Sequence, residues 1–255
     1  GMLYVELILT TMSRDVHSQY APVLPSAAWQ MVELLGKLRK DGIVQIPGFY
    51  EDIIPATEEE NAILNVGPNV DEALKKTYGT YPVYDKKTGY YATLNNQPTF
   101  NISGVFSGFT GEGGATVLPS KATAKIDMRL VVAQSGEKIL GQLKDYIRTL
   151  GYDNVEVVCR GITDPAKTSI HTPYLPVIQK AVNGIFGSSL IYPNRPSTAP
   201  DYLWTNILGL PTIQVRWCDF DSDNHAPNEH LSVENYLRGI ALTASALMEI
   251  GTAEL

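Results

Sequence analysis

Residues 121–132 constrain the fold of this chain more than any other segment, because hydrophobic and polar residues alternate there without a break. In an extended segment, Lys125, Asp127 and Arg129 fall on one face and the apolar residues fall on the other. The apolar residues are Ala122, Ala124, Ile126, Met128, Leu130 and Val132. An antiparallel strand with one face on the core shows this pattern. The segment therefore predicts a sheet that is covered on one face only.

The segments around this strand occur in a recognisable order. Strands are predicted at residues 3–9, 99–106 and 155–159, which are rich in apolar and β-branched residues. Helices are predicted at residues 24–40 and 135–150, where apolar residues recur at helical spacing. The order strand, helix, strand, strand, helix, strand predicts a ferredoxin-like (βαββαβ) domain.

Residues 42–97 show no single period and carry turn signals such as Pro47-Gly48 and Gly67-Pro68. Because this stretch is too long for a plain loop in a compact domain, we interpret it as an insertion with structure of its own. Gly42, at its start, fits the end of the preceding helix.

Residues beyond about 165 follow another pattern. Predicted helices alternate with apolar strands at residues 190–192 and 211–217, which indicates part of an α/β sheet. The strands are few for a complete domain, and a strand-like run begins directly after Gly1-Met2. We therefore expect an α+β domain at residues 3–165, an incomplete α/β domain at 166–255, and a missing portion upstream.

Composition excludes some classes of protein. Hydrophobic residues make up 44% of the chain and no apolar run reaches bilayer length, so a membrane partner is not expected. A net charge of −7 without a Lys/Arg cluster argues against a nucleic-acid partner. Cys159 and Cys218 lack CxxC spacing, which predicts reduced, buried thiols in a cytoplasmic protein.

The stretch from Asp219 to Glu229 follows a predicted strand and is rich in side chains that can bind metal or substrate. It contains His225 among several carboxylates and amides. Imidazole and carboxylates are the ligands that zinc prefers. The alternative is that the aspartates are solvated turn residues and that His225 caps the following helix. Local sequence leaves both interpretations open.

Four other residues carry side chains that could take part in chemistry. His17 lies in a loop after a strand and is either a catalyst or a surface histidine. Arg129 lies on the polar face of its strand, where it either clamps a carboxylate or pairs with a cross-strand carboxylate. His171 and His230 are interpreted as structural. The chain has no phosphate loop, G-x-S-x-G elbow or H-E-x-x-H helix.

Six short motifs occur in an order and spacing that resembles a family of dinuclear metallohydrolases, peptidase family M20. This family includes acetylornithine deacetylase, succinyl-diaminopimelate desuccinylase, carboxypeptidase G and carnosinase. The motifs are Asp15-Val16-His17-Ser18, Asn101-Ile102-Ser103-Gly104, Gly111-Glu112-Gly113, Val117-Leu118-Pro119, Asp127-Met128-Arg129-Leu130-Val131 and His225-Ala226-Pro227-Asn228-Glu229. The run from Ile46 to Tyr50 and the long insertion are more similar to the carnosinase-type dipeptidases.

The resemblance implies a ferredoxin-like lid domain that mediates homodimerisation, followed by the C-terminal part of an α/β zinc-peptidase domain. The N-terminal part of that domain, which carries most metal ligands and the general base, has no counterpart here. The implied activity is metal-dependent hydrolysis of a small peptide or acyl-amino acid beside a free carboxylate, as in dipeptidases or carboxypeptidases.

The resemblance also implies roles for individual residues. His225 would be a metal ligand, and His17 would polarise the scissile carbonyl in the partner subunit's site. Asn101 and Arg129 would bind the substrate backbone and its carboxylate. Arg195 would lie near the substrate loop, where residues 197–200 read Ser-Thr-Ala-Pro instead of a glycine-rich run.

The implied cofactor is zinc in a two-metal site, with cobalt or manganese as alternatives. We expect the chain alone not to bind it and to be inactive unless a separate N-terminal polypeptide completes the site. The alternative is a non-catalytic, dimerising, ligand-binding relic of such an enzyme.

Overall fold

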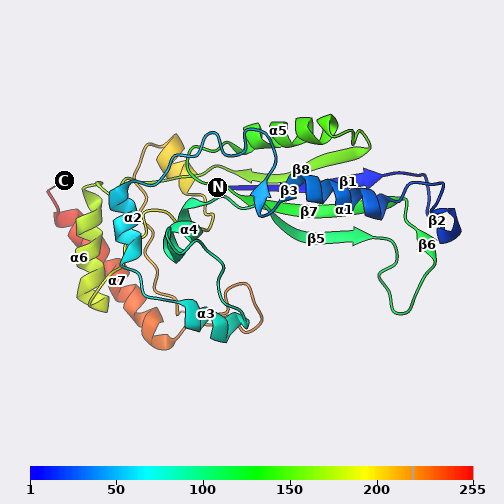
Figure 1. Ribbon diagram of the computed structural model, residues 1–255. Coiled ribbons are helices and arrows are strands. Elements are labelled where there is room, and N and C mark those ends of the chain that lie inside the picture. Colours follow the sequence, from blue (N-terminus) through cyan, green and yellow to red (C-terminus); the bar gives the residue numbers. More distant parts are fainter. Residues whose placement is uncertain (220, 255) are drawn as a thin grey trace. The chain divides into compact units, whose positions relative to one another are not determined.

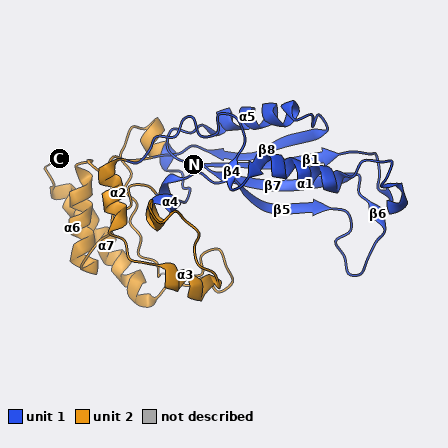
Figure 2. Ribbon diagram, in the orientation of Figure 1, with its two compact units in different colours: residues 1–56, 92–166, 195–202 blue, residues 57–91, 167–194, 203–255 orange. Residues whose placement is uncertain are grey.

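The computed structural model describes residues 1–219 and 221–254. The chain divides into two compact units, which Figure 2 shows in different colours. Unit 1 comprises residues 1–56, 92–166 and 195–202, and unit 2 comprises residues 57–91, 167–194 and 203–255. The domain boundary predicted near residue 165 stays a prediction, and each unit is described by itself below.

Unit 1 is built on a four-stranded antiparallel sheet in the order β5-β7-β1-β8 (Figure 1). Its strands are β1 (Met2–Thr10), β5 (Asn101–Ser107), β7 (Lys121–Arg129) and β8 (Val155–Thr163). Helix α1 (Ala27–Leu38) follows β1, and helix α5 (Gly136–Thr149) connects β7 with β8. This connectivity and strand order confirm the ferredoxin-like βαββαβ prediction.

The two helices cover one face of this sheet because every second residue of the central strands is apolar. In β1 these residues are fully buried against α1 and α5, as are their counterparts in β7. The core includes Leu3, Val5, Leu7, Leu9, Ile126, Met128, Met31, Leu34, Ile139 and Leu143. The other face, which we call the open face, carries Tyr4, Glu6, Lys125, Asp127 and Arg129, all of them half-exposed.

Local sequence explains where the helices begin. Ser26 and Ser135 cap α1 and α5 by accepting hydrogen bonds from backbone N–H groups in the first turn. Gly42, however, does not end α1. It forms a turn with Asp41 between the short strands β3 (Arg39–Lys40) and β4 (Ile43–Val44). Both turn residues have positive φ, as a two-residue hairpin of this kind requires.

A short arm extends beyond the end of β1. Strand β2 (Val16–His17) pairs with β6 (Val117–Leu118), and the 3₁₀ helix η1 (Ser18–Tyr20) follows (Figure 1). Asp15 fixes the arm by accepting hydrogen bonds from the Ser120 hydroxyl, at 2.7 Å, and the Ser120 backbone N–H, at 2.8 Å. These two hydrogen bonds stabilise the ionised form and lower the pKa of Asp15.

Unit 2 is mainly helical. It contains α2 (Glu58–Asn65), α3 (Asp71–Tyr78), the start of α4 (Tyr90–Asn96), α6 (Tyr174–Phe186), a π-helical turn η2 (Leu203–Ile207) and α7 (Val233–Thr252). Helices α6 and α7 pack together, with Ala181 and Leu242 buried. Gly239 allows the Trp217 ring to approach α7, because a Cβ at this position would lie 2.6 Å from the ring.

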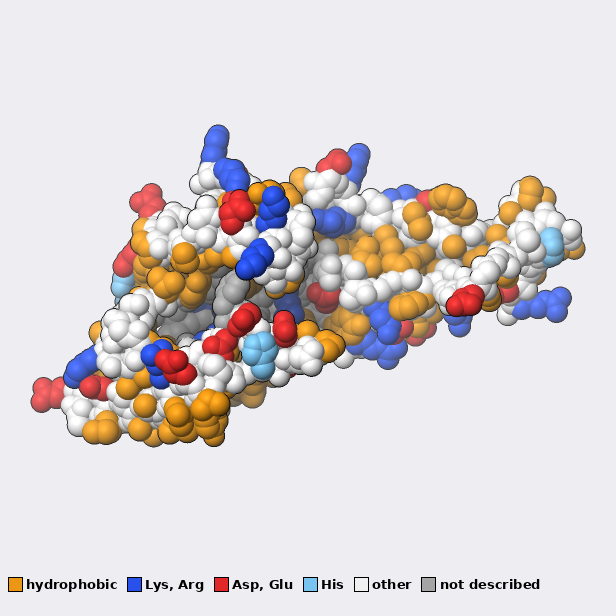
Figure 3. All heavy atoms as spheres, turned by 90° about the horizontal axis from the view of Figure 1, so that it is seen from below, with side chains coloured by type: hydrophobic (Ala, Val, Ile, Leu, Met, Phe, Trp, Pro, Cys, Tyr) orange, Lys and Arg blue, Asp and Glu red, His pale blue; other side chains and the backbone are white. Residues whose placement is uncertain are grey.

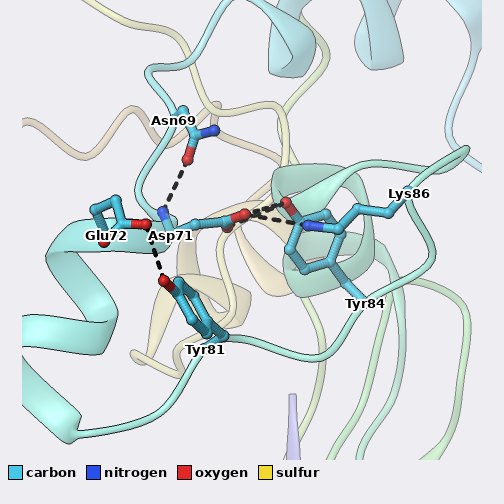
Figure 4. Close-up of polar contacts among 6 residues, drawn as sticks. All are labelled: Asn69, Asp71, Glu72, Tyr81, Tyr84 and Lys86. Carbon is cyan, nitrogen blue, oxygen red and sulfur yellow. Dashed lines mark hydrogen bonds and ion pairs between the residues drawn. The ribbon is translucent and has the colours of Figure 1, made fainter.

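Polar contacts hold the turn after α3. The Asp71 carboxylate accepts hydrogen bonds from the Tyr84 hydroxyl and the Lys86 ammonium, both at 3.1 Å (Figure 4). Nearby, the Tyr81 hydroxyl donates to Glu72 (Figure 4). These contacts order a segment whose own sequence shows no helical or strand period.

Two details predicted from sequence are wrong. Residues 190–192 and 211–217 form no strand; in the described part of the chain no strand lies beside them to complete a ladder. The Thr212 backbone N–H instead donates to the Thr168 hydroxyl. Cys159 and Cys218 are exposed rather than buried, because β8 is an edge strand and residue 218 lies in irregular chain. None of the described helices is long and apolar enough to cross a bilayer.

Candidate functional site

Strands β5 and β7 bring two predicted substrate-binding residues to the open face. Asn101 lies opposite Asp127 in the sheet, and Arg129 lies two residues further along the same strand. Because side chains alternate along a strand, all three point to the same face. The Asn101 amide donates to the Asp127 carboxylate at 2.8 Å, which orients the amide. Their shared face agrees with the common substrate site that the resemblance implies for Asn101 and Arg129.

Arg129 is held at both its backbone and its side chain. Its N–H donates to the Thr99 hydroxyl at 2.9 Å, and its carbonyl accepts from the Thr99 N–H at 2.9 Å. Its guanidinium Nη1 donates to the Thr198 hydroxyl at 3.0 Å. The side chain therefore has a defined position at the end of β7.

The guanidinium of Arg129 has no counter-ion among the described residues. Its cross-strand neighbour on β1 is Met2, so the alternative of a cross-strand carboxylate pair is wrong. The other arginine on this sheet, Arg160, pairs with the carboxylate of Glu6. A half-buried guanidinium without a carboxylate partner is suited to receive one from a ligand, because its planar donors match a carboxylate.

The predicted substrate loop lies in the same unit as Arg129. Residues 195–202 belong to unit 1, and Arg195 is half-buried there. Thr198 is the residue of this loop that reaches Arg129, and sequence reasoning missed it. The signal that could have identified it is a hydroxyl at a position where the resemblance leads one to expect glycine.

His17 lies at the other end of the sheet. Its Nδ1 accepts a hydrogen bond from the Gln19 N–H at 3.1 Å, so the neutral ring carries its proton on Nε2. That nitrogen lies 3.3 Å from the Thr116 hydroxyl. Arg129 pairs with the first residue of β1, whereas His17 follows its last residue, so the two are separated by about 27 Å or more. Within one copy of the chain they cannot contact the same small ligand.

His225 lies in unit 2, in an exposed loop with unusual backbone geometry. Asp223, His225 and Asn228 all have positive φ, and the His230 N–H closes the loop by donating to the Ser222 carbonyl at 3.0 Å. Phe220, within the same acidic stretch, is outside the described residues. Among the residues described, no group of three His, Cys, Asp or Glu side chains could hold a metal ion. A catalytic zinc needs about three protein ligands, so these residues do not fit one by themselves.

The carboxylate of Asp219 binds the residues at which this loop ends and α7 begins. It accepts hydrogen bonds from the Ser232 N–H at 2.6 Å and from the Asn235 amide at 2.6 Å. Ser232 is the N-cap of α7, so the alternative that His225 caps this helix is wrong. The hydrogen bond from the Ser232 N–H makes the largest contribution to lowering the pKa of Asp219.

We expect Asp219→Asn to loosen the first turn of α7, because the amide cannot replace a charged acceptor of three hydrogen bonds. Amide exchange at Ser232 and Asn235 should accelerate about fivefold at neutral pH. Since the pKa of Asp219 is lowered on folding, its contribution is present at neutral pH and is lost as the pH falls below the ordinary carboxyl range. Unchanged exchange at neutral pH would show that Asp219 does not hold the helix start.

Comparison with known proteins finds similarity between this chain and peptidases. Residues 4–155 match the family described as the peptidase dimerisation domain, M20_dimer. The chain is 25% identical over 260 residues to the Beta-Ala-His dipeptidase of Homo sapiens, which covers 98% of this chain and 51% of the relative. It is 25% identical over 266 residues to the Cys-Gly metallodipeptidase DUG1 of Saccharomyces cerevisiae, covering 97% and 53%.

Solved structures agree with these similarities. An M20 family metallo-carboxypeptidase, Sso-CP2 from Sulfolobus solfataricus, superposes with a TM-score of 0.90 at 30% identity, covering 97% of this chain and 57% of that one. Human carnosine dipeptidase 1 superposes with a TM-score of 0.84 at 22% identity, covering 99% and 56%, which shows a shared fold. The chain spans about half the length of the curated relatives it matches.

Proposed function

We propose that this chain, which belongs to the M20 peptidase dimerisation family, provides the dimerising and carboxylate-binding part of a metal-dependent dipeptidase or carboxypeptidase. The substrate would be a small peptide or acyl-amino acid, cleaved beside a free carboxylate. The observation that carries this proposal is Arg129, a fixed guanidinium on the open face without a carboxylate partner in the described residues. Asn101, oriented by Asp127, would bind the substrate backbone beside it.

The rest of the catalytic apparatus would come from polypeptide outside this chain. His225 would contribute a single ligand to a site with two zinc ions, or with cobalt or manganese, and Arg195 would border the substrate. Metal ions in such sites polarise a carbonyl and activate water. Because the described residues contain no ligand cluster, we expect this chain alone to be inactive unless polypeptide that supplies the upstream part completes the site. Exposed thiols without a disulfide are consistent with a cytoplasmic location.

The surface of unit 1 supports a homodimer. In the described part of the chain no strand pairs with the outer edge of β5, and Phe106 on this strand is 53% exposed. Helix α1 packs on β7, next to β5, and exposes Trp29 (69%) and Val32 (55%) one turn apart. Figure 3 views the molecule from the side on which β5 lies, and hydrophobic side chains gather there. A twofold pairing of this edge and helix would bury them.

Dimerisation would also give His17 a function. Since His17 and Arg129 lie too far apart to meet within one copy, His17 would act on a ligand that is bound by the partner subunit. Its Nε2–H, set by the hydrogen bond from Gln19 to Nδ1, is the donor that could stabilise an oxyanion. The arm formed by β2 and β6 would carry it.

We expect Arg129→Ala to remove the preference of the protein for ligands with a free carboxylate. The test is an NMR titration with β-alanyl-L-histidine and with its C-terminal amide, which differ only in that group. Wild type should bind the acid about tenfold or more tightly than the amide, as charged hydrogen bonds contribute about 1.5–3 kcal/mol. Arg129→Ala should bind both equally, and Arg160→Ala, which breaks an internal ion pair, should behave as wild type. An unchanged preference in Arg129→Ala would contradict the proposal.

A further inference from the structure

Thr198 makes two hydrogen bonds that require a hydroxyl group. Its Oγ1 accepts a hydrogen bond from the Arg129 guanidinium at 3.0 Å and donates one to the Gly1 carbonyl at 3.1 Å. The same carbonyl accepts from the Leu130 N–H at 3.0 Å, which fixes it beside the residue that follows Arg129. The hydroxyl proton is therefore committed to a rigid acceptor, and the oxygen lone pairs remain directed at the guanidinium.

This arrangement leaves most N–H donors of the Arg129 guanidinium without a side-chain partner among the described residues. Arginine carries five N–H donors, and Thr198 is the one side-chain partner that the described residues provide for them. Because Thr198 is uncharged, it orients Arg129 without neutralising it. An aspartate or glutamate in the place of Thr198 would form an ion pair with the guanidinium, as Glu6 does with Arg160.

We propose that Thr198 is a positioning residue for Arg129, which holds the guanidinium in the orientation that receives a ligand carboxylate. This inference rests on the proposed function, since it assigns a ligand-binding role to Arg129. An arginine side chain loses much rotamer freedom when it binds a ligand, and prior ordering by Thr198 removes part of that cost. The loop that carries Thr198 thereby influences selectivity for carboxylates although it needs no contact with the carboxylate itself.

Two measurements on the full chain test this role. The first is ¹⁵N NMR of the arginine guanidinium groups without ligand. Thr198→Val, which keeps the side-chain shape, should free rotation of the Arg129 guanidinium, whereas Thr198→Ser should keep it hindered as in wild type. The Arg160 signals should stay unchanged in both variants and report intact folding.

The second measurement is the ratio of affinities for β-alanyl-L-histidine and its C-terminal amide. Thr198→Val should lower this ratio about fivefold to tenfold, and Thr198→Ser should restore it. If Thr198→Val leaves both the Arg129 signals and the ratio unchanged while Arg129→Ala abolishes the ratio, the positioning role is overturned and the proposed function stands. If Arg129→Ala leaves the affinity ratio unchanged, the proposed function fails. Guanidinium rotation that is hindered only when Thr198 is present would then show that Thr198 orders Arg129, but not that this ordering serves carboxylate binding.

Discussion

Trp29→Ala is expected to convert the proposed homodimer into monomers at concentrations where wild type should remain dimeric. Trp29 is the most exposed large hydrophobic side chain of α1, which packs on β7, the strand next to β5. Buried tryptophans at the centre of interfaces commonly contribute 2 kcal/mol or more, so Kd should rise by about 30-fold or more. Sedimentation equilibrium over a concentration series measures this change.

The matched control is Trp204→Ala, which removes a half-exposed tryptophan from unit 2. This variant should keep the dimerisation constant of wild type. Because Trp29 contributes little to the core, both variants should retain the far-UV circular dichroism of wild type. A wild-type dimer that Trp29→Ala leaves intact would show that α1 is not at the interface.

Lys167→Met is expected to cause the largest loss of folding stability among single substitutions of charged residues. Lys167 forms an ion pair with Glu60, whose side chain is 6% exposed. Burial would raise the pKa of Glu60, but Lys167 and hydrogen bonds from Thr57 outweigh burial and lower it. Removing Lys167 leaves a buried carboxylate unpaired, which should reduce the free energy of unfolding by about 3 kcal/mol at pH 7.

The pH dependence of the stability loss in Lys167→Met follows from the direction in which the pKa of Glu60 is shifted. In wild type the folded pKa of Glu60 is lowered, so its contribution is present at neutral pH and is lost as the pH falls through the carboxyl range. In the variant the pKa should be raised, and protonation should remove the penalty. The two proteins should therefore converge in stability as the pH falls below the ordinary carboxyl range, through the lowered pKa of Glu60 in wild type.

Urea unfolding at several pH values measures this difference. Lys180→Met serves as the control, because the Lys180 side chain is 72% exposed in its pair with Glu249 and its loss should cost less than about 1 kcal/mol at every pH. Equal effects of the two substitutions would contradict a special role for the buried pair.

Sequence alone predicted the parts of the fold that depend on local periodicity. The alternation around Ile126 defined the one-sided sheet, since successive side chains on a strand point to opposite faces whatever their neighbours are. The helix predicted from residue 135 begins there because Ser135 caps α5, and an N-cap acts on its own first turn.

Features that depend on distant partners were not predictable in this way. Residues 211–217 have strand-like composition, but a strand also needs a neighbour with which to share backbone hydrogen bonds. Asp41 and Gly42 form a hairpin turn because β3 and β4 pair, and local patterns alone favoured a helix end. The cysteines were predicted to be buried from their typical behaviour, and their actual exposure follows from an edge strand and an irregular segment.

In the candidate site, too, features set by local sequence were predictable and features set by tertiary contacts were not. Strand alternation placed Arg129 on the polar face of its strand, and the family resemblance implied that Asn101 binds the same substrate. Thr198 was missed because its importance lies in a tertiary contact between a loop and β7 that no local pattern encodes. Likewise, Asp219 looked like one acidic residue among several, and its hydrogen bonds to Ser232 and Asn235 at the start of α7 are tertiary contacts.

Calorimetric titration of the purified chain with zinc tests most directly whether this polypeptide needs ligands from elsewhere to form a metal site. We expect no stoichiometric binding with a Kd below about 1 μM, because His225 is not grouped with two further ligands among the described residues. Weak or absent zinc binding, together with carboxylate-dependent peptide binding, is the predicted result. Tight binding of one or two zinc ions that is lost in His225→Ala would contradict it.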